Sequence, residues 1–400
     1  MEANLDRSRI IIDVSHTFRS AYRTGIQRVV REFGSNVEQE SNCYIAWFPN
    51  FLKVYFIELR QTDIRSDRSQ RPTGDIKKKL DKYSSKVISN FYLLRTLMIY
   101  LHEILLFAKI LSSPSNYRIH KIRPGDKILL IDAFWADPRF KRKLERFENL
   151  DLRIYLFVHD LFPVSNPEWF NKRQITQFRK SMKKAFQVSH TVICASEFVK
   201  SEILKLFPMQ ITSIDKILTV KLACSNLEVE TDKVNRDGIV VLGTIEPRKN
   251  VSLILDWIEA FNPKEKVWFI GRKGWESPQT FIRMDKLALK GKIIWIEDAS
   301  DQDVAFHLGR RRVGILASEA EGFGLPILEY ARFGLHILAR DIPSFKEINS
   351  AGTFYFSSAP ELEKSYLKTI GLSQPEPYRS DYSWKSFTSI ILSTINSNDQ

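Results

Sequence analysis

The chain has 400 residues, of which 44% are hydrophobic and 27% charged, which excludes a disordered or low-complexity protein. A single hydrophobic core rarely grows much beyond about 250 residues, so two domains are expected. The 60 Lys and Arg exceed the 47 Asp and Glu, and the net charge of +13 indicates an anionic partner such as a phosphate, an acidic lipid or nucleic acid.

Short runs of β-branched and aromatic residues alternate with helix-length segments along the whole chain. This alternation is typical of parallel sheets whose strands are joined by crossover helices. Strands are predicted in the first half at residues 9–15, 44–48, 54–59, 127–132, 153–159, 191–195 and 217–223. They would form the sheet of an amino-terminal domain, residues 1–225.

Residues 61–125 are predicted to be a basic helical insertion in this domain. They contain 13 Lys or Arg against 5 Asp or Glu, an excess of 8 that accounts for most of the net charge of +13. The basic run 76–80 precedes the apolar segment 91–111, an arrangement that suits an anionic membrane surface. The alternative is a helical hairpin that packs on the first domain. We reject a membrane-spanning helix at 92–111 because this segment contains Arg, His, Glu and Lys side chains.

Two observations bear on the cellular compartment. The first apolar run, residues 10–14, is shorter than the core of a signal peptide, so secretion is not expected. The three cysteines, Cys43, Cys194 and Cys224, have no metal-ligand spacing, and an odd number cannot form a complete disulfide framework. Both observations favour a reducing compartment.

A polar stretch from Ser225 to Gly238 is the predicted linker between the domains. The second domain, residues 226–365, is expected to be a compact doubly wound unit with ligand sites beyond the carboxyl ends of its strands. Residues 366–400 are expected to form a helix and a frayed tail. Strands are predicted at 238–245, 266–271, 292–296, 313–317, 336–339 and 353–356, with helices at 251–261 and from Pro326 to Phe333.

The sequence ASEAEGFGLPILE, which ends at Glu329, directly follows a predicted buried strand. Gly322 and Gly324 permit a close backbone approach to a ligand, and Pro326 suits the first turn of a helix. The amide groups of this loop and helix end suit phosphate or sugar oxygens. We expect Glu321 and Glu329 to accept hydrogen bonds from ligand hydroxyls. The alternative is a capped helix with solvent-facing glutamates.

The sequence GTIEPRKN, residues 243–250, again leads from a predicted strand into a helix. Arg248 and Lys249 would stand at the carboxyl edge of the first strand of the second domain, where they could neutralise a diphosphate. A basic helix start is disfavoured by the helix dipole, which favours a ligand-binding role over a purely structural one.

These two stretches and IGRKGW at 270–275 resemble the carboxyl-terminal domain of the family 4 retaining glycosyltransferases of GT-B fold. The family's Glu-x7-Glu signature is matched by Glu321 and Glu329. Three stretches of the first domain resemble the family's early glycine loop, its His-containing strand end and a later strand-to-helix turn: TGIQR at 24–28, VHDLFP at 158–163 and ASEFVK at 195–200. The resemblance covers both domains, roughly residues 9–350.

The resemblance implies two Rossmann-like doubly wound domains that face each other across a cleft. It implies transfer of a sugar from a nucleoside diphosphate donor to a hydroxyl, with retention at the anomeric carbon and no metal or other cofactor. The expected acceptor is a lipid-linked molecule or a polysaccharide, in bacterial cell-surface polysaccharide synthesis such as that of lipopolysaccharide. The expected location is the cytoplasm, peripherally at the inner face of the cell membrane.

The resemblance also implies roles for single residues. Glu321 would hold the hydroxyls of the donor sugar and Glu329 those of the ribose. Arg248 and Lys249 would stabilise the departing diphosphate, and His159 would lie near the reacting sugar. Further donor contacts are implied at Gly25, Gly322, Phe323, Gly324 and Leu325. The family often has an arginine where this chain has Thr244, so Arg248 is the candidate that replaces its guanidinium.

Other patterns are better explained without a ligand. Asp301 and Asp303 have the spacing of a metal-binding pair, but they lie at a predicted helix start, where capping is the better interpretation. No His-Glu-x-x-His motif is present, so catalytic zinc is not expected. The glycine turn at 271–274 is weak evidence of a phosphate site, and Trp275 is as readily a packing residue.

Two alternative functions remain open from the sequence alone. A sugar-nucleotide-modifying enzyme of the same fold, such as an epimerase, would alter its nucleotide sugar without an acceptor. A basic nucleic-acid-binding protein would account for the charge, but no recognisable reading motif is present, and nucleic acid is therefore not an expected partner.

Overall fold

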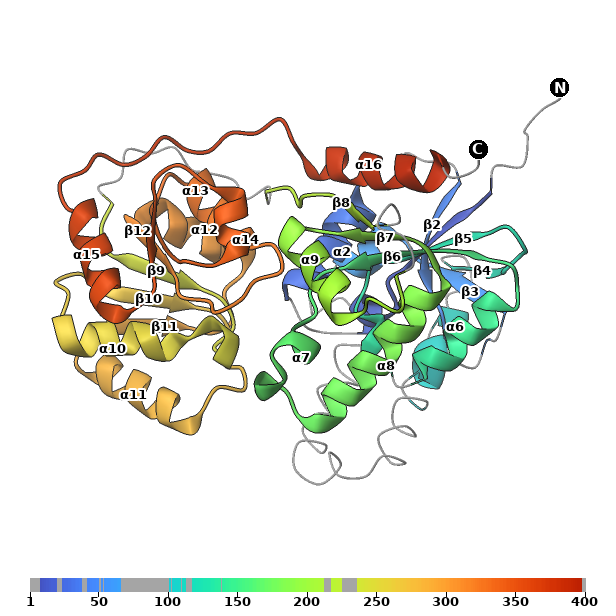
Figure 1. Cartoon of the computed structure of the whole chain (residues 1–400), viewed down its shortest axis with the longest axis horizontal. Helices are drawn as coiled ribbons and strands as arrows, with labels where there is room; N and C mark the ends of the chain where they lie inside the picture. The colour runs from blue at the N-terminus through green and yellow to red at the C-terminus, as the bar shows by residue number, and fades with distance from the viewer. Residues whose placement is uncertain are drawn as a thin grey trace. The chain divides into compact units, whose positions relative to one another are not determined.

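The computed structural model describes residues 8–19, 24–37, 42–49, 52, 54–65, 101, 103–108, 110–112, 117–137, 139–211, 217–224 and 236–397. The basic run 76–80 and most of the predicted linker, residues 225–235, lie outside the described residues. The chain forms two compact units (Figure 1): a first unit of residues 1–194, 200–220 and 384–400, and a second of residues 195–199 and 221–383.

The first unit is built on an eight-stranded sheet in the order β4-β3-β2-β1-β5-β6-β7-β8. Its strands are β1 Ile10–Asp13, β2 Cys43–Trp47, β3 Tyr55–Glu58, β4 Arg118–Lys121, β5 Lys127–Leu130, β6 Arg153–Val158, β7 Ser189–Cys194 and β8 Ile217–Thr219. β3 is antiparallel to both of its neighbours, and the other pairs are parallel. β1 and β5 are buried along their whole length, as expected for strands that are covered on both faces.

All seven strands predicted for the first domain are present, and β4 is an addition. β4 has the sequence RIHK, is mostly exposed and forms one edge of the sheet, so it lacks the apolar pattern that identifies inner strands. Because β4 pairs with β3, the segment 61–125 is not purely a helical insertion. Its described part consists of α3 (Gln61–Arg65), the helical residues 101, 103–108 and 110–111, and β4.

Helices surround this sheet, and one of them comes from the far end of the chain. The helices are α1 Ser15–Arg19, α2 Gly25–Ser35, η3 Phe134–Ala136, α6 Phe140–Glu148, α7 Phe162–Ser165, η4 Pro167–Trp169, α8 Lys172–Val188, α9 Glu197–Leu206 and α16 Trp384–Ser397. In α16, drawn in red in Figure 1, the ring of Phe387 meets Phe33 of α2 edge to face, with 6.1 Å between centroids. Lys127, only 1% exposed, donates to the carbonyl oxygen of Ile395 at 2.9 Å. A cation is favourable at this carboxyl end of the helix dipole.

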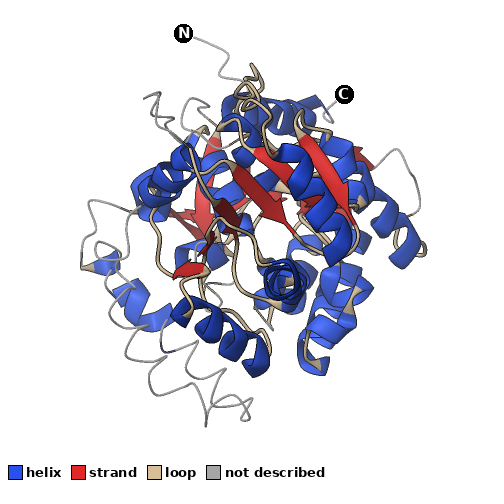
Figure 2. Cartoon of the chain, turned by 90° about the vertical axis from the view of Figure 1, so that its left-hand side faces the viewer, coloured by secondary structure: helices blue, strands red, loops and turns tan. Residues whose placement is uncertain are grey.

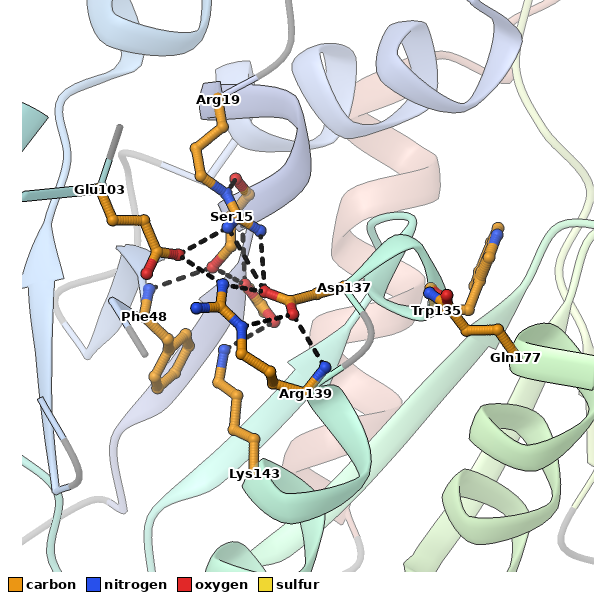
Figure 3. A network of polar contacts seen from close by, with 10 residues as sticks. Ser15, Arg19, Phe48, Glu103, Trp135, Asp137, Arg139, Lys143 and Gln177 are labelled. Atoms are coloured by element: carbon orange, nitrogen blue, oxygen red, sulfur yellow. Dashed lines mark hydrogen bonds and ion pairs between the residues drawn. The ribbon is translucent and has the colours of Figure 1, made fainter. Parts of the chain in front are cut away.

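A buried ionic cluster joins several parts of the first unit (Figure 3). Glu103, in the helical part of residues 101–111, is fully buried and lies 2.6 Å from Arg19 Nη1 and 3.4 Å from Arg139 Nη2. Both arginines also pair with Asp137, at 3.4 and 3.0 Å. Burial favours a raised pKa for Asp137, but the charges of Arg19 and Arg139 outweigh burial and hold that pKa well below its ordinary value. The cluster therefore fixes the helical segment to α1 and to the loop before α6 through charged side chains.

The second unit contains six parallel strands in the order β11-β10-β9-β12-β13-β14. The strands are β9 Ile239–Leu242, β10 Val267–Ile270, β11 Ile293–Ile296, β12 Val313–Leu316, β13 His336–Arg340 and β14 Thr353–Phe356. The helices are η6 Pro247–Lys249, α10 Val251–Phe261, α11 Pro278–Leu289, α12 Asp301–Arg310, α13 Leu325–Arg332, α14 Pro343–Ile348 and α15 Ala359–Thr369. Helices flank the strands on both sides (Figure 2), so the predicted doubly wound α/β class is confirmed.

The carboxyl-terminal boundary differs from the prediction. Helix α15 continues across residue 365, and the second unit extends to Ser383. Tyr366 of α15 packs edge to face on Trp257 of α10, with 5.4 Å between ring centroids, which keeps this helix in the second unit.

Among the described residues, no helix has both the length and the apolar character needed to span a membrane.

Candidate active site

The two motifs of the second domain follow neighbouring strands. β9 lies between β10 and β12, and the chain order of the strands reverses at this point of the sheet. The connections that leave β9 and β12 therefore run in opposite directions, which is where doubly wound sheets bind their ligands. GTIEPRKN follows β9 and EGFGLPILE follows β12, so both sequence motifs lie at this position.

The connection after β9 places two cations. Gly243 has a φ of 137°, and a Cβ atom there would lie 3.1 Å from Cε of Lys249. The absence of a side chain at this position leaves space for the Lys249 side chain. Asn250, with a φ of 46°, ends η6 and caps α10 by accepting a hydrogen bond from the amide of Leu253. Both cations thus lie in a short 3-10 turn that is directly followed by a capped helix.

Glu321 binds both cations. Its Oε1 lies 2.5 Å from Lys249 Nζ, and its Oε2 lies 2.5 Å from Arg248 Nη1. Ser318 Oγ donates to Oε1 at 2.8 Å. Arg248 also pairs with Glu246 at 2.7 Å. We call these five residues the Glu321 cluster; it contains two cations and two carboxylates.

The charges of the cluster decide the ionisation of Glu321. Burial by itself would raise the pKa of this carboxyl, but Arg248 and Lys249 outweigh burial and lower the pKa to about 2. Glu321 is therefore a carboxylate at neutral pH. A carboxylate has about four acceptor positions, and three donors of the cluster occupy three of them. One position is left for a ligand hydroxyl.

The connection after β12 leads into α13 through a glycine that cannot be replaced easily. Gly324 has a φ of 102°, and a Cβ atom there would lie 2.8 Å from the ring of Phe345. Its neighbour Phe323 has a buried side chain, so Phe323 can offer a ligand only its backbone. Gly322 precedes α13, Leu325 begins it, and the first amide groups of a helix have no partner within the helix. This part of the chain suits an anion or sugar oxygens.

Glu329 lies on the fifth residue of α13 and is buried. The hydroxyl of the next residue, Tyr330, accepts a hydrogen bond from the amide of Leu242 at the end of β9, at 2.8 Å. This contact holds α13 over the end of β9. The sequence predicted that Glu321 and Glu329 both accept hydrogen bonds from ligand hydroxyls. The structure brings Glu321 to both cations and adds Glu246 as a second carboxylate on Arg248.

Glu246 was not among the predicted site residues. The signal was present in the sequence, since Glu246 precedes Arg248 by two positions in EPRK. A carboxylate next to a candidate phosphate-binding arginine can reach its guanidinium, but spacing alone does not show that it does.

The glycine turn after β10 has a structural explanation. Cβ atoms at Gly271 and Gly274 would overlap the carbonyl oxygens of Gly243 and Ile245. Ile245 donates to the carbonyl oxygen of Arg272 at 2.9 Å and accepts from the amide of Gly274 at 3.1 Å. The glycines therefore allow two backbone segments to pair. Trp275, in contrast, is 56% exposed, so more than half of its side chain is open to solvent.

The Asp301 and Asp303 pair lies at the start of α12. Ser300 is the N-cap residue, and its amide donates to Asp303 Oδ2 at 2.8 Å while its hydroxyl accepts from the amide of Asp303 at 3.1 Å. This reciprocal arrangement is a capping box, and the predicted capping role is confirmed for Asp303.

The remaining predicted site residues belong to the first unit. Gly25 is the first residue of α2, and a Cβ atom there would meet nothing within 4 Å, so its backbone is open to an approaching group. His159 follows β6, is 7% exposed and donates from Nε2 to the carbonyl oxygen of Ile131 at 2.7 Å. Burial lowers the pKa of His159 to about 4. The ring is neutral at pH 7, so a ligand can meet it as a hydrogen-bonding partner and not as a cation.

The state of His159 predicts a pH dependence of stability. The folded protein holds this ring with a pKa of about 4, below the ordinary value of 6.5, so the unfolded chain binds more protons between these pH values. The contribution of the neutral His159 ring to the free energy of unfolding is complete above pH 6.5 and is lost as the pH falls towards 4. At 1.36 kcal/mol per pKa unit, the loss is roughly 3 kcal/mol. We expect the difference in free energy of unfolding between wild type and His159→Gln to change by that amount across this range.

Denaturant titrations of both proteins at several pH values would measure this difference. Burial raises the pKa of the nearby Asp132 to about 6, which acts with the opposite sign, but Asp132 is present in both proteins and cancels. A difference that stays constant between pH 4 and 6.5 would contradict a buried neutral His159.

Comparisons with known proteins agree with this geometry. Residues 226–369 match the family model described as glycosyl transferases group 1. This match covers most of the second unit. The chain is 26% identical over 267 residues to the serotype-specific mannosyltransferase WbdA of Escherichia coli. The aligned region covers 60% of this chain and 33% of WbdA. The chain is also 25% identical over 250 residues to the O-antigen chain mannosyltransferase B of Escherichia coli. That alignment covers 55% of this chain and 65% of mannosyltransferase B.

Two solved structures resemble both units of this chain. Anabaena HepE in complex with UDP and glucose has a TM-score of 0.58 and 14% identity over 98% of each chain. A sucrose-phosphate synthase from Thermosynechococcus elongatus has a TM-score of 0.59 and 14% identity, over 98% of this chain and 94% of that one. The predicted GT-B fold class is confirmed, and the family match supports the recognition of a glycosyltransferase. The chain spans only about a third of the length of WbdA.

Proposed function

We propose that this protein is a retaining glycosyltransferase that moves a sugar from a nucleoside diphosphate donor to an acceptor hydroxyl. The observation that carries the proposal is the contact of Glu321 with both Arg248 and Lys249 at the point where the strand order of a glycosyl transferases group 1 domain reverses. Glu321 would accept from a donor-sugar hydroxyl, and Glu329, on the helix held over β9, would bind the ribose hydroxyls.

The chemistry of the cluster fits this reaction. Cleavage of the bond between sugar and diphosphate builds negative charge on the leaving group, and cations held in place before the reaction stabilise that charge. Arg248 offers a planar fork and Lys249 a point charge. Two cations supplied by the protein would do this without a metal. The acceptor oxygen would attack on the face from which the diphosphate departs, and the acceptor proton would pass to a leaving phosphate oxygen.

The relatives narrow the proposed substrates. WbdA and the O-antigen chain protein of Escherichia coli are both named mannosyltransferases, so mannose is the first sugar to test, and a polysaccharide or lipid-linked glycan is the first acceptor. We place the enzyme in the cytoplasm at the inner face of the cell membrane. The excess of basic residues in 61–125 supports attraction to an anionic lipid surface.

The proposal is tested with a panel of nucleoside diphosphate sugars. A donor that binds the folded state raises the melting temperature by mass action, and at 100 times its Kd the gain is about 2.7 kcal/mol. We expect a nucleoside diphosphate mannose to give the largest shift, and transfer to be seen only when a glycan acceptor is added. A donor that is altered without any acceptor would favour the epimerase alternative. No shift with any member of the panel would contradict both.

A further inference from the structure

Trp275 is the only one of the eight tryptophans whose side chain is exposed. Its exposed fraction is 56%, whereas the other seven are buried or half-buried. All eight lie within the described residues. Exposure of a large apolar ring to water is energetically unfavourable. An exposed aromatic side chain on a binding edge commonly serves as a contact for a ligand.

The backbone that carries Trp275 is held firmly. Ile245 and the segment 272–274 pair by two hydrogen bonds, at 2.9 and 3.1 Å. The carbonyl oxygen of Gly271 accepts from Trp295 Nε1 at 2.8 Å. Gly271 and Gly274 have no space for a Cβ atom. Trp275 therefore projects from a fixed turn beside the strand that leads to Arg248 and Lys249.

The order of the strands gives the position of Trp275 relative to the Glu321 cluster. β10, β9 and β12 are consecutive in the sheet, and at their carboxyl ends they lead to Trp275, to the Arg248 and Lys249 pair, and to Glu321. Neighbouring strands lie about 4.8 Å apart, so β10 and β12 are roughly 10 Å apart, a span comparable to that of a nucleotide. The cations are in the middle of this row.

We propose that Trp275 stacks on the base of the donor nucleotide. The inference rests on the proposed function: if the two cations hold the diphosphate and Glu321 holds the sugar, the nucleoside extends to the other side of the diphosphate, over β10. Every base has an aromatic face, so an indole stacks on uracil or guanine alike. Trp275 would then supply affinity for the nucleoside and little choice between bases.

Binding measurements on the full chain test this contact. Trp275→Ala is expected to weaken binding of UDP and GDP by about 5- to 150-fold, the range found for loss of one base–aromatic stack. Trp275→Phe keeps an aromatic face and should retain most of the affinity. Inorganic diphosphate has no base, so its Kd should be the same in wild type and Trp275→Ala. Because the side chain is exposed, both variants should melt near the wild-type temperature.

Acrylamide quenching of fluorescence gives a second readout. The emission of Trp275 is the difference between the emission of wild type and that of Trp275→Phe. Saturating UDP or GDP should protect this emission from quenching by acrylamide. Equal affinity of wild type and Trp275→Ala for the nucleoside diphosphates would overturn the stacking, and so would an equal loss for inorganic diphosphate. Protection by a glycan acceptor alone would assign Trp275 to the acceptor instead. If wild type binds no nucleoside diphosphate, the proposed function itself fails, and the stacking fails with it.

Discussion

Lys249→Gln is expected to lower the rate of sugar transfer by about 10²- to 10³-fold, the usual effect of removing one preorganised group that stabilises developing negative charge. Lys249 Nζ is held 2.5 Å from Glu321 Oε1, in the space that Gly243 leaves open. Gln is of similar length but carries no charge. Glu321 keeps its ion pair with Arg248 in this variant, so the fold should remain intact.

The measurement is kcat with saturating donor and acceptor, together with a thermal melt. Lys264→Gln is a matched control, because Lys264 is an exposed lysine of the same unit. It should transfer sugar at the wild-type rate. A Lys249→Gln protein with wild-type kcat would remove Lys249 from the proposed mechanism.

Glu329→Ala tests the proposed ribose contact and should mainly raise the KM for the donor.

Glu103→Ala is expected to destabilise the first unit by about 3–5 kcal/mol, because removing one partner leaves buried charges without compensation. Glu103 is fully buried between Arg19 and Arg139, at 2.6 and 3.4 Å (Figure 3). In the variant, Asp137 would have to balance both guanidinium groups. Glu103→Gln should lose less, since an amide oxygen can still accept from Arg19.

Denaturant unfolding measures this loss, with the transitions of the two units analysed separately because a chain of two units need not unfold in one step. Glu145→Ala is the matched control. Glu145 also belongs to an ion pair of the first unit, with Lys141 at 3.6 Å, but both of these side chains are exposed. Exposed pairs contribute about 0–1 kcal/mol. A Glu103→Ala protein as stable as this control would show that the cluster does not hold the helical segment in place.

The sequence predicts inner strands most directly, because their apolar runs are buried along their whole length. Ile10–Asp13 begins with three isoleucines and Ile239–Leu242 is entirely aliphatic, a pattern typical of an inner parallel strand. β4 has no such run, because an edge strand with exposed side chains needs only backbone partners. α16 was expected as a helix, but its attachment to the first unit depends on contacts such as that of Phe387 with Phe33, which no local pattern encodes.

The sequence predicted some features of the candidate site and missed others. Motif and helix dipole together placed Arg248, Lys249 and Glu321 at one edge of the sheet, and the structure brings these three into contact. The sequence did not reveal that Glu246 shares Arg248, because the choice of partner depends on side-chain geometry. It also could not separate a ligand-binding glycine from a packing glycine. Gly271 and Gly274 proved to be required by the backbone of residues 243–245, which follow β9.

The attachment of α16 has a consequence for protein synthesis. Ribosomes make the chain from its amino terminus, so residues 384–397 emerge only after every residue of the second unit. Phe387, Ile391 and Ile395 are fully buried in the first unit, which therefore cannot complete its core while translation is still in progress upstream of them. The first unit is thus unable to finish folding until the whole second unit has been synthesised.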